Sequence, residues 1–360
     1  MDILVLDTNF TAISILDTYE SFIWTDRYDS YGDFELCLPM SKEILDIIKV
    51  DYYLWIKESE HCMIVESITV DTDTEDGDTI TFAGRSLESI LNRRIVWGQK
   101  ILSGSVQDAI KGLINECFIS PENADRKIDN FVFTESTDTR ITSLQIDSQE
   151  TGTNLYDLIQ TLCSNNNLGF KIVLNDSNQF VFSLYAGTDR SFEQSTNPYV
   201  VFSSKYDNIV SSNYYSSKME YKNVSLVGGE GEGSERKMAS AGEATGLNRR
   251  EIFIDAYDIS STTDSGTLTE DEYTAKLKSR GEEELSDYAE NNAFEGEADT
   301  ARMFKYGEDF FIGDIVQFED NYGHDGAAYI SEIVISSDQN GDTTYPTFKV
   351  YENTTKESNA

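Results

Sequence analysis

Short runs of alternating apolar and polar residues recur along this chain, and three of them appear in the same order near both ends. The first set covers residues 53–57, 63–70 and 80–82, and the second covers residues 314–318, 328–335 and 346–348. A period of two predicts strands, and the polar breaks between the runs predict turns. In both sets the second turn ends in Gly-Asp-Thr, at residues 77–79 and 341–343. The pattern predicts one three-stranded module that occurs twice in the chain.

The remainder of the first hundred residues also favours strands, which are expected at residues 3–6, 21–25 and 34–38. Residues 41–48 predict a helical turn or two with Ser41 as the N-cap, because a serine side chain accepts from free backbone N–H groups there. Residues 86–94 predict a short amphipathic helix with cations in its last turn, where the helix dipole favours them.

The chain changes character between about 100 and 195. A helix is predicted to begin at Ser105, with one apolar face made by Val106, Ile110, Leu113, Ile114 and Cys117. A polar, loop-like stretch follows, and then a second helix at 153–163 that ends in the Asn- and Gly-rich residues 165–169. Residues 169–174 and 180–185 predict a hairpin. This region therefore reads as an α+β unit.

From about 196 the chain is β-rich again, with strands expected at residues 199–202, 209–215, 219–227 and 249–255. Thr269 and Glu272 form a capping box that opens a helix reaching about residue 291, with Tyr273, Leu277, Leu285 and Tyr288 as its apolar positions. The predicted units are a first β-unit at 1–99, the α+β unit at 100–195, a second β-unit at 196–255 and 307–353, a helical insertion at 256–306 and a disordered tail at 354–360.

Composition supports a folded, β-rich chain of two to four domains, with 39% hydrophobic residues, 12% aromatics and few prolines. The net charge of −37 excludes a protein that binds nucleic acid by neutralising phosphates, or one that binds an anionic membrane surface. Such a charge keeps a protein soluble. It would also make a surface that repels nucleic acid and lets it slide past.

The four cysteines lie far apart in apolar or helical surroundings, at positions 37, 62, 117 and 163. Their spacing predicts buried, reduced thiols rather than a disulfide framework or a metal site. The N-terminus has no basic region, and no run approaches the roughly 20 apolar residues of a membrane-spanning helix. We therefore expect a soluble protein that carries no standard export signal.

Candidate chemistry is sparse. His61 and His324 lie in the polar breaks of the two modules, outside any zinc-binding spacing, and a loop-exposed position is expected for both. Cys117 or Cys163 could serve a thiol hydrolase, but each is on the apolar side of a helix. The glycine run at 228–233 lacks the Lys-Ser/Thr of a phosphate loop, and residues 71–82 fail the calcium-loop pattern at the glycine and at the twelfth position. The sequence therefore predicts no catalytic, cofactor-binding or metal-binding residues, and no cofactor.

Several stretches together resemble one family. Residues 21–28, 31–36 and 84–91 resemble the opening of the baseplate hub, or tail-tip hub, proteins of long-tailed bacteriophages. The later landmarks are similar too, at residues 153–163, 168–170, 221–233, 306–307 and 313–316. The likeness spans nearly the whole chain.

The resemblance implies a non-enzymatic homotrimer in the virion, assembled in the host cytoplasm. Each subunit would give two related β-barrel tube domains to a pseudo-sixfold ring that adapts a sixfold tail tube to a threefold tip. DNA would pass through the lumen without specific binding. Distal tail or tail tube proteins would bind above, tip, spike or fibre proteins below, and the tape measure protein is a further expected partner.

Three alternatives stay open at this point. The chain could be a tail-associated peptidoglycan hydrolase, although it lacks a recognisable His, Cys or Glu constellation. It could be a receptor-binding protein of the tail tip, or the hub of a phage-derived tailocin or injection machine.

Overall fold

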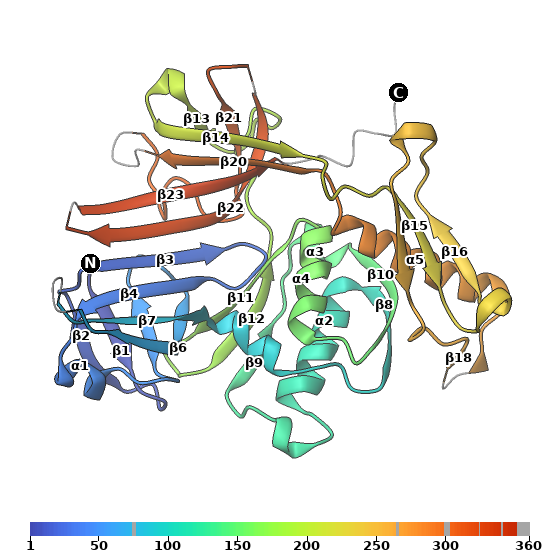
Figure 1. Ribbon diagram of the computed structural model, residues 1–360, viewed down its shortest axis with the longest axis horizontal. Coiled ribbons are helices and arrows are strands. Elements are labelled where there is room, and N and C mark those ends of the chain that lie inside the picture. Colours follow the sequence, from blue (N-terminus) through green and yellow to red (C-terminus); the bar gives the residue numbers. More distant parts are fainter. Residues whose placement is uncertain (74–76, 264–265, 299–302, 324, 340, 351–360) are drawn as a thin grey trace.

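A computed structural model describes residues 1–73, 77–263, 266–298, 303–323, 325–339 and 341–350 (Figure 1). The strands of the first half are β1 (Ile3–Leu6), β2 (Ala12–Leu16), β3 (Ser21–Arg27), β4 (Asp33–Pro39), β5 (Tyr53–Ile56), β6 (Cys62–Asp71), β7 (Thr79–Ser86), β8 (Gln99–Ser105), β9 (Phe131–Thr134), β10 (Gln145–Thr151), β11 (Gly169–Leu174) and β12 (Phe180–Tyr185). Those of the second half are β13 (Val201–Ser203), β14 (Ile209–Ser217), β15 (Val224–Gly228), β16 (Met238–Ala241), β17 (Glu251–Asp255), β18 (Thr262–Thr263), β19 (Gly266–Thr267), β20 (Asn291–Ala298), β21 (Ile315–Glu319), β22 (Asp325–Asp338) and β23 (Gly341–Val350).

The α-helices are α1 (Lys42–Ile47), α2 (Val106–Ile114), α3 (Thr139–Thr142), α4 (Leu155–Asn165) and α5 (Glu270–Ser286). Shorter helical turns are η1 (Leu87–Arg93), η2 (Asn115–Ile119), η3 (Ala124–Arg126), η4 (Ser204–Tyr206), η5 (Gly233–Glu235) and η6 (Gly246–Asn248). The mostly β, α+β class expected from the sequence is confirmed for this part of the chain. Within it, no helix combines the length and the apolar character that crossing a bilayer requires.

One large sheet contains both β-modules (Figure 1). Its strand order is β14-β20-β23-β22-β3-β4-β7-β6-β5-β1-β2, with β21 beside β22 and β13 beside β21. A single core fills it, because alternate residues of both modules point to the same interior. Its largest fully buried members are Phe22, Trp24, Phe82, Phe202, Phe310, Phe318 and Phe348. Segments from opposite ends of the chain thus form one packed body.

The α+β unit lies beside this sheet (Figure 1). All five residues predicted for the first helical face, Val106, Ile110, Leu113, Ile114 and Cys117, are buried. The second helix is α4, with Asn154 as its N-cap and Asn167 in the left-handed conformation just past its end (φ 51°), as the polar cluster there predicted. The hairpin is β11 and β12, with the predicted bounds.

One expectation for this unit was wrong. The stretch read as loop between the helices contains β9, α3 and β10, whose short runs give no clear period. The core of this unit also reaches across the predicted boundary at residue 99, since Cys62 and Ile64 of β6 pack in the same cluster as Leu155 and Phe170. The short helix expected at 86–94 is the 3-10 helix η1, and it contributes Leu87, Ile90 and Leu91 to that cluster.

The sequence placed residues 196–255 in the second β-unit and residues 256–306 in an insertion. The strand pairing divides these two segments differently. Strands β15, β16 and β17 form a separate sheet, and α5 packs on it through Tyr273 and Leu277. The helix approaches so closely that a Cβ on Gly281 would lie 2.5 Å from Ser225 Oγ. Strand β20, by contrast, pairs with β14 and β23 in the large sheet.

Some predicted element boundaries differ from those in the structure. The Thr269 capping box is present, and α5 ends at Ser286 rather than near 291. The strand expected at 219–227 begins only at Val224. His324, residues 74–76 of the acidic turn and the tail at 354–360 lie outside the described residues. The division into separately folding domains stays a prediction.

Candidate functional site

The two predicted modules have the same three-stranded structure. In each, the middle strand pairs antiparallel with both neighbours, β6 with β5 and β7, and β22 with β21 and β23. Each middle strand carries one bulged residue, Glu66 in β6 and Ser331 in β22. The bulges fall at matching positions, since Val65 and Ile330 are the last paired residues before them. A bulge redirects a strand, so its repetition at one position indicates a true structural repeat.

The segment that enters each module repeats as well. Asp51 and Gly313 both have positive φ angles, 67° and 86°, just before the first strand. The N–H of Asp51 donates to the carbonyl of Val65 (2.9 Å), and the N–H of Gly313 donates to that of Ile330 (2.8 Å). The register also aligns the two Gly-Asp-Thr turns. Thr79 pairs with Asp71 in the first module and Thr343 pairs with Ser336 in the second, and Asp71 and Ser336 occupy equivalent positions after the two bulges.

The likeness extends to a six-stranded unit. The first reads β3-β4-β7-β6-β5-β1 and the second reads β14-β20-β23-β22-β21-β13. In both, register places a Phe-Glu pair at the same step of the second strand, Phe34 with Glu35 and Phe294 with Glu295. The last strand differs, because β1 runs antiparallel to β5 whereas β13 runs parallel to β21. Sequence reasoning found the three-stranded modules and a strand at 209–215, which is β14, but it missed β20, whose residues were assigned to the helical insertion.

One antiparallel joint connects the two units. Strand β22 pairs with β3 from Glu332 opposite Arg27 to Asp338 opposite Ser21. Arg27 anchors this joint, donating to Asp33 (2.6 Å) and to Glu332 (2.9 Å). Through this pairing the two six-stranded units form one continuous sheet.

Tyr28, directly after β3, fixes the α+β unit against this surface. Its hydroxyl donates to the carbonyl of Asn167 (3.0 Å) and accepts from the N–H of Gly187 (3.2 Å). Its ring packs so tightly on Gly313 that a Cβ there would lie 2.2 Å from it. Asp314 completes the contact by pairing with Arg190 (2.7 Å). The landmark at residues 313–316 is therefore where three parts of the chain meet.

The solvent-facing side of the large sheet bears mixed charge. Asp33, Glu35, Glu66 and Arg85 line an open hollow on it. Arg85 binds Glu66 through two bonds of 2.6 and 2.8 Å, which neutralises one carboxylate. Carboxylates remain in excess on this hollow, in keeping with the charge of the whole chain.

His61 is buried, and the expectation of a loop-exposed side chain was wrong. It is 3% exposed, and its Nδ1 lies 3.1 Å from Glu88 Oε1. Burial alone would lower the pKa of His61, but the charges of Glu88 and Asp26 outweigh it and raise the pKa to about 9. The pKa of Glu88 is lowered, since His61 outweighs its burial. Glu88 also accepts from the N–H of Ile172 (2.7 Å), so this ion pair ties η1 to β11.

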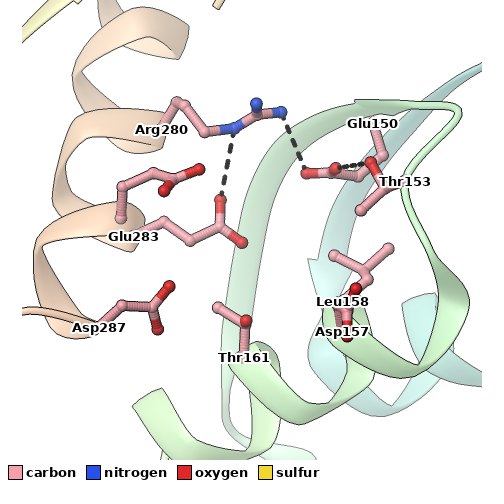
Figure 2. Close-up of a pocket in the computed structure, with 9 residues that line it drawn as sticks. Glu150, Thr153, Asp157, Leu158, Thr161, Arg280, Glu283 and Asp287 are labelled. Carbon is pink, nitrogen blue, oxygen red and sulfur yellow. Dashed lines mark hydrogen bonds and ion pairs between the residues drawn. The ribbon is translucent and has the colours of Figure 1, made fainter. Parts of the chain in front are cut away.

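A carboxylate-lined cavity lies between α4 and α5 (Figure 2). Glu150 and Glu283 point toward Arg280, whose Nη2 lies 3.4 Å from Glu150 Oε1 and whose Nε lies 3.8 Å from Glu283 Oε2. Burial, helped by the charge of Glu150, raises the pKa of Glu283 to about 7. The described part of the chain holds no group of three or more His, Cys, Asp or Glu side chains able to bind a metal ion.

The other candidates of the sequence take structural places. Cys117 and Cys163 are buried, and burial raises the pKa of both thiols, which disfavours a thiolate nucleophile. Cys62 is buried, Cys37 is half-buried, and all four thiols are free. The glycine run forms a turn in which Gly231 and Gly233 have positive φ angles.

Three solved structures share this fold over nearly their whole lengths. The 43 kDa tail protein of prophage MuSo2 from Shewanella oneidensis is 14% identical with a TM-score of 0.58, covering 97% of this chain and 98% of that one. The tail protein from Neisseria meningitidis MC58 is 13% identical with a TM-score of 0.58, covering 97% and 96%. The prophage tail protein gp18 from Listeria monocytogenes EGD-e is 12% identical with a TM-score of 0.54, covering 99% and 96%.

Identities this low show the fold alone. A search of curated proteins found no match. The family model of the Siphovirus ReqiPepy6 Gp37-like proteins, in contrast, matches residues 2–348. Since that match spans nearly the entire sequence, the chain belongs to the family of Siphovirus ReqiPepy6 Gp37-like proteins, and its fold is similar to that of the three prophage tail proteins.

Proposed function

We propose that this protein is the structural hub of a phage tail tip, in which three copies form a ring around the path of DNA. The observation that carries the proposal is the duplicated six-stranded unit within one sheet. Three chains with two units each present six equivalent surfaces, which suits a sixfold tube on one side and a threefold tip on the other. Closed symmetry fixes the number of copies, and pairing of neighbours removes free sheet edges.

The charge of the chain supports a role in letting DNA pass. With the solvent-facing side of the sheet toward the lumen, Glu35 would face the polyanion together with Asp33 and Glu66, which are paired with Arg27 and Arg85. Like charge keeps DNA from adsorbing to the wall during ejection. A neutral or basic lumen in a structure of the assembled ring would contradict this part of the proposal.

The proposed neighbours are distal tail or tail tube proteins above the ring, spike, tip or fibre proteins below it, and the tape measure protein. The proposed location is the virion, and the proposed role is structural rather than enzymatic. Digestion of cell walls in a zymogram would favour a peptidoglycan hydrolase instead. Binding to purified host surface without affinity for tail tube proteins would favour a receptor binder.

The number of chains in the assembled particle tests the proposed ring. Mass photometry of the purified chain should find a species of three chain masses, and electron micrographs of the tail tip should show threefold symmetry below sixfold symmetry. A stable monomer or dimer within the assembled particle would refute the hub.

A further inference from the structure

The joint between the two units is asymmetric within one chain. Past its bulge, β22 has β23 on one side and β3 on the other. Its counterpart β6 has β7 on one side and, from Ser67 to Asp71, no described strand on the other. The counterpart of β3 is β14, which has β20 on one side and likewise no described strand on the other. The chain therefore holds one formed joint and the two unmatched halves of a second.

Side-chain exposure marks those halves as uncovered. In the formed joint Ile335 of β22 lies opposite Trp24 of β3, and their exposed fractions are 3% and 0%. Register makes Val70 the counterpart of Ile335 and Tyr214 the counterpart of Trp24. Val70 is 42% exposed and Tyr214 is 39% exposed. The positions that the formed joint buries are thus partly exposed to solvent on β6 and β14.

The two edges also have compatible charge. Residues 211–217 of β14 carry no charged side chain, and residues 67–71 of β6 carry one, Asp71. In a chain with a net charge of −37, edges this neutral can approach without placing like charges opposite each other. Exposed strand edges are normally protected by charge or proline; residues 211–217 of β14 have neither, and residues 67–71 of β6 have only Asp71 at the strand end.

We propose that β14 of one copy pairs antiparallel with β6 of the next copy, in the register of the β22–β3 joint. Val70 then lies opposite Tyr214, and Thr69 lies opposite Tyr215. This inference rests on the proposed ring and names the contact that builds it. The occupant of each edge is a second copy of this chain, because both halves come from the repeat that already forms the same joint internally. Such a head-to-tail contact closes into a ring when its rotation permits.

Disulfide trapping tests the register. Opposed residues of an antiparallel pair have Cα atoms about 4.5–5.5 Å apart, within disulfide reach. The double variant T69C/Y215C should form covalent oligomers on mild oxidation, several-fold more than the control T69C/Y214C, because Tyr214 and Tyr215 point to opposite faces of the strand. Equal cross-linking of both variants would overturn the register.

A second pair of variants tests the same contact without introducing cysteines. Val70→Asp should shift the purified chain from oligomer to monomer several-fold, with unchanged melting of the monomer, since Val70 is exposed there. Val50→Asp, at a valine exposed by 48%, should leave the oligomer intact. If trimers form but neither the trapping nor Val70→Asp has the expected effect, the edge contact fails and the ring proposal stands. If no oligomer and no cross-link form at the highest soluble concentration, both fail.

Discussion

The buried pair of His61 and Glu88 should make stability depend on pH in a defined window. The pKa of His61 is raised from 6.5 to about 9 in the folded chain. A raised histidine pKa contributes stability that is fully present below 6.5 and is lost as pH rises through 9. This shift corresponds to about 3 kcal/mol at pH 6, falling to about 1 kcal/mol at pH 8 and to almost nothing at pH 9.5.

Glu88→Gln removes this contribution while keeping the shape of the side chain. The glutamine oxygen can still accept from the N–H of Ile172, and its amide can donate to a neutral His61. Urea unfolding should therefore show a loss of up to about 3 kcal/mol at pH 6 and a much smaller loss at pH 9.5. Asp26 is unchanged in the variant and still favours the charged histidine, so part of the contribution remains.

The matched control is Glu60→Gln, the same chemical change beside His61 on a side chain that is 53% exposed. It should change stability by at most about 0.5 kcal/mol at either pH, because solvent screens the charge. An equal loss for Glu88→Gln at pH 6 and pH 9.5 would refute the reasoning, since the defect would then be one of packing rather than charge.

Further predictions concern the junction, the cavity and the thiols. Gly313→Ala should lower the melting temperature far more than Gly307→Ala, because both glycines have positive φ but only Gly313 would place its Cβ against Tyr28, with open space around Gly307. Glu283→Gln should raise stability above pH 7 and leave it unchanged below pH 4.5, as measured by thermal unfolding, because a carboxylate whose pKa rises to about 7 is unfavourable in the fold when ionised. An alkylating reagent should label only Cys37 in the native chain, as read by intact mass, because the other thiols are buried; rapid labelling of a second thiol would contradict the packing.

Local signals in the sequence were enough for several elements. The faces of α2 and α4, the capping box of α5 and the hairpin of β11 and β12 each follow from periodicity and capping within a dozen residues. The repeat was also visible, because its apolar runs and the Gly-Asp-Thr turn lie within single strands and turns. Patterns that depend only on near neighbours survive in any tertiary context.

One strand that completes the repeat needed partners to become a strand. β20 is polar and was placed in the helical insertion, and it is held in the sheet by backbone pairing with β14 and β23. β8 and β10 likewise pair across about 40 residues of chain. Backbone hydrogen bonds carry no side-chain signature, so a sequence pattern cannot predict them.

The sequence by itself determined a mostly β, acidic chain with one module written twice and no recognisable catalytic pattern. Only the tertiary structure decided how the copies relate: which strands share a sheet, that His61 is buried beside Glu88, and that one joint is formed while no described strand pairs with the outer edges of β6 and β14. The physical reason is distance along the chain. β3 and β22 meet across some 300 residues, and contacts of that range are set by packing and register rather than by local preference.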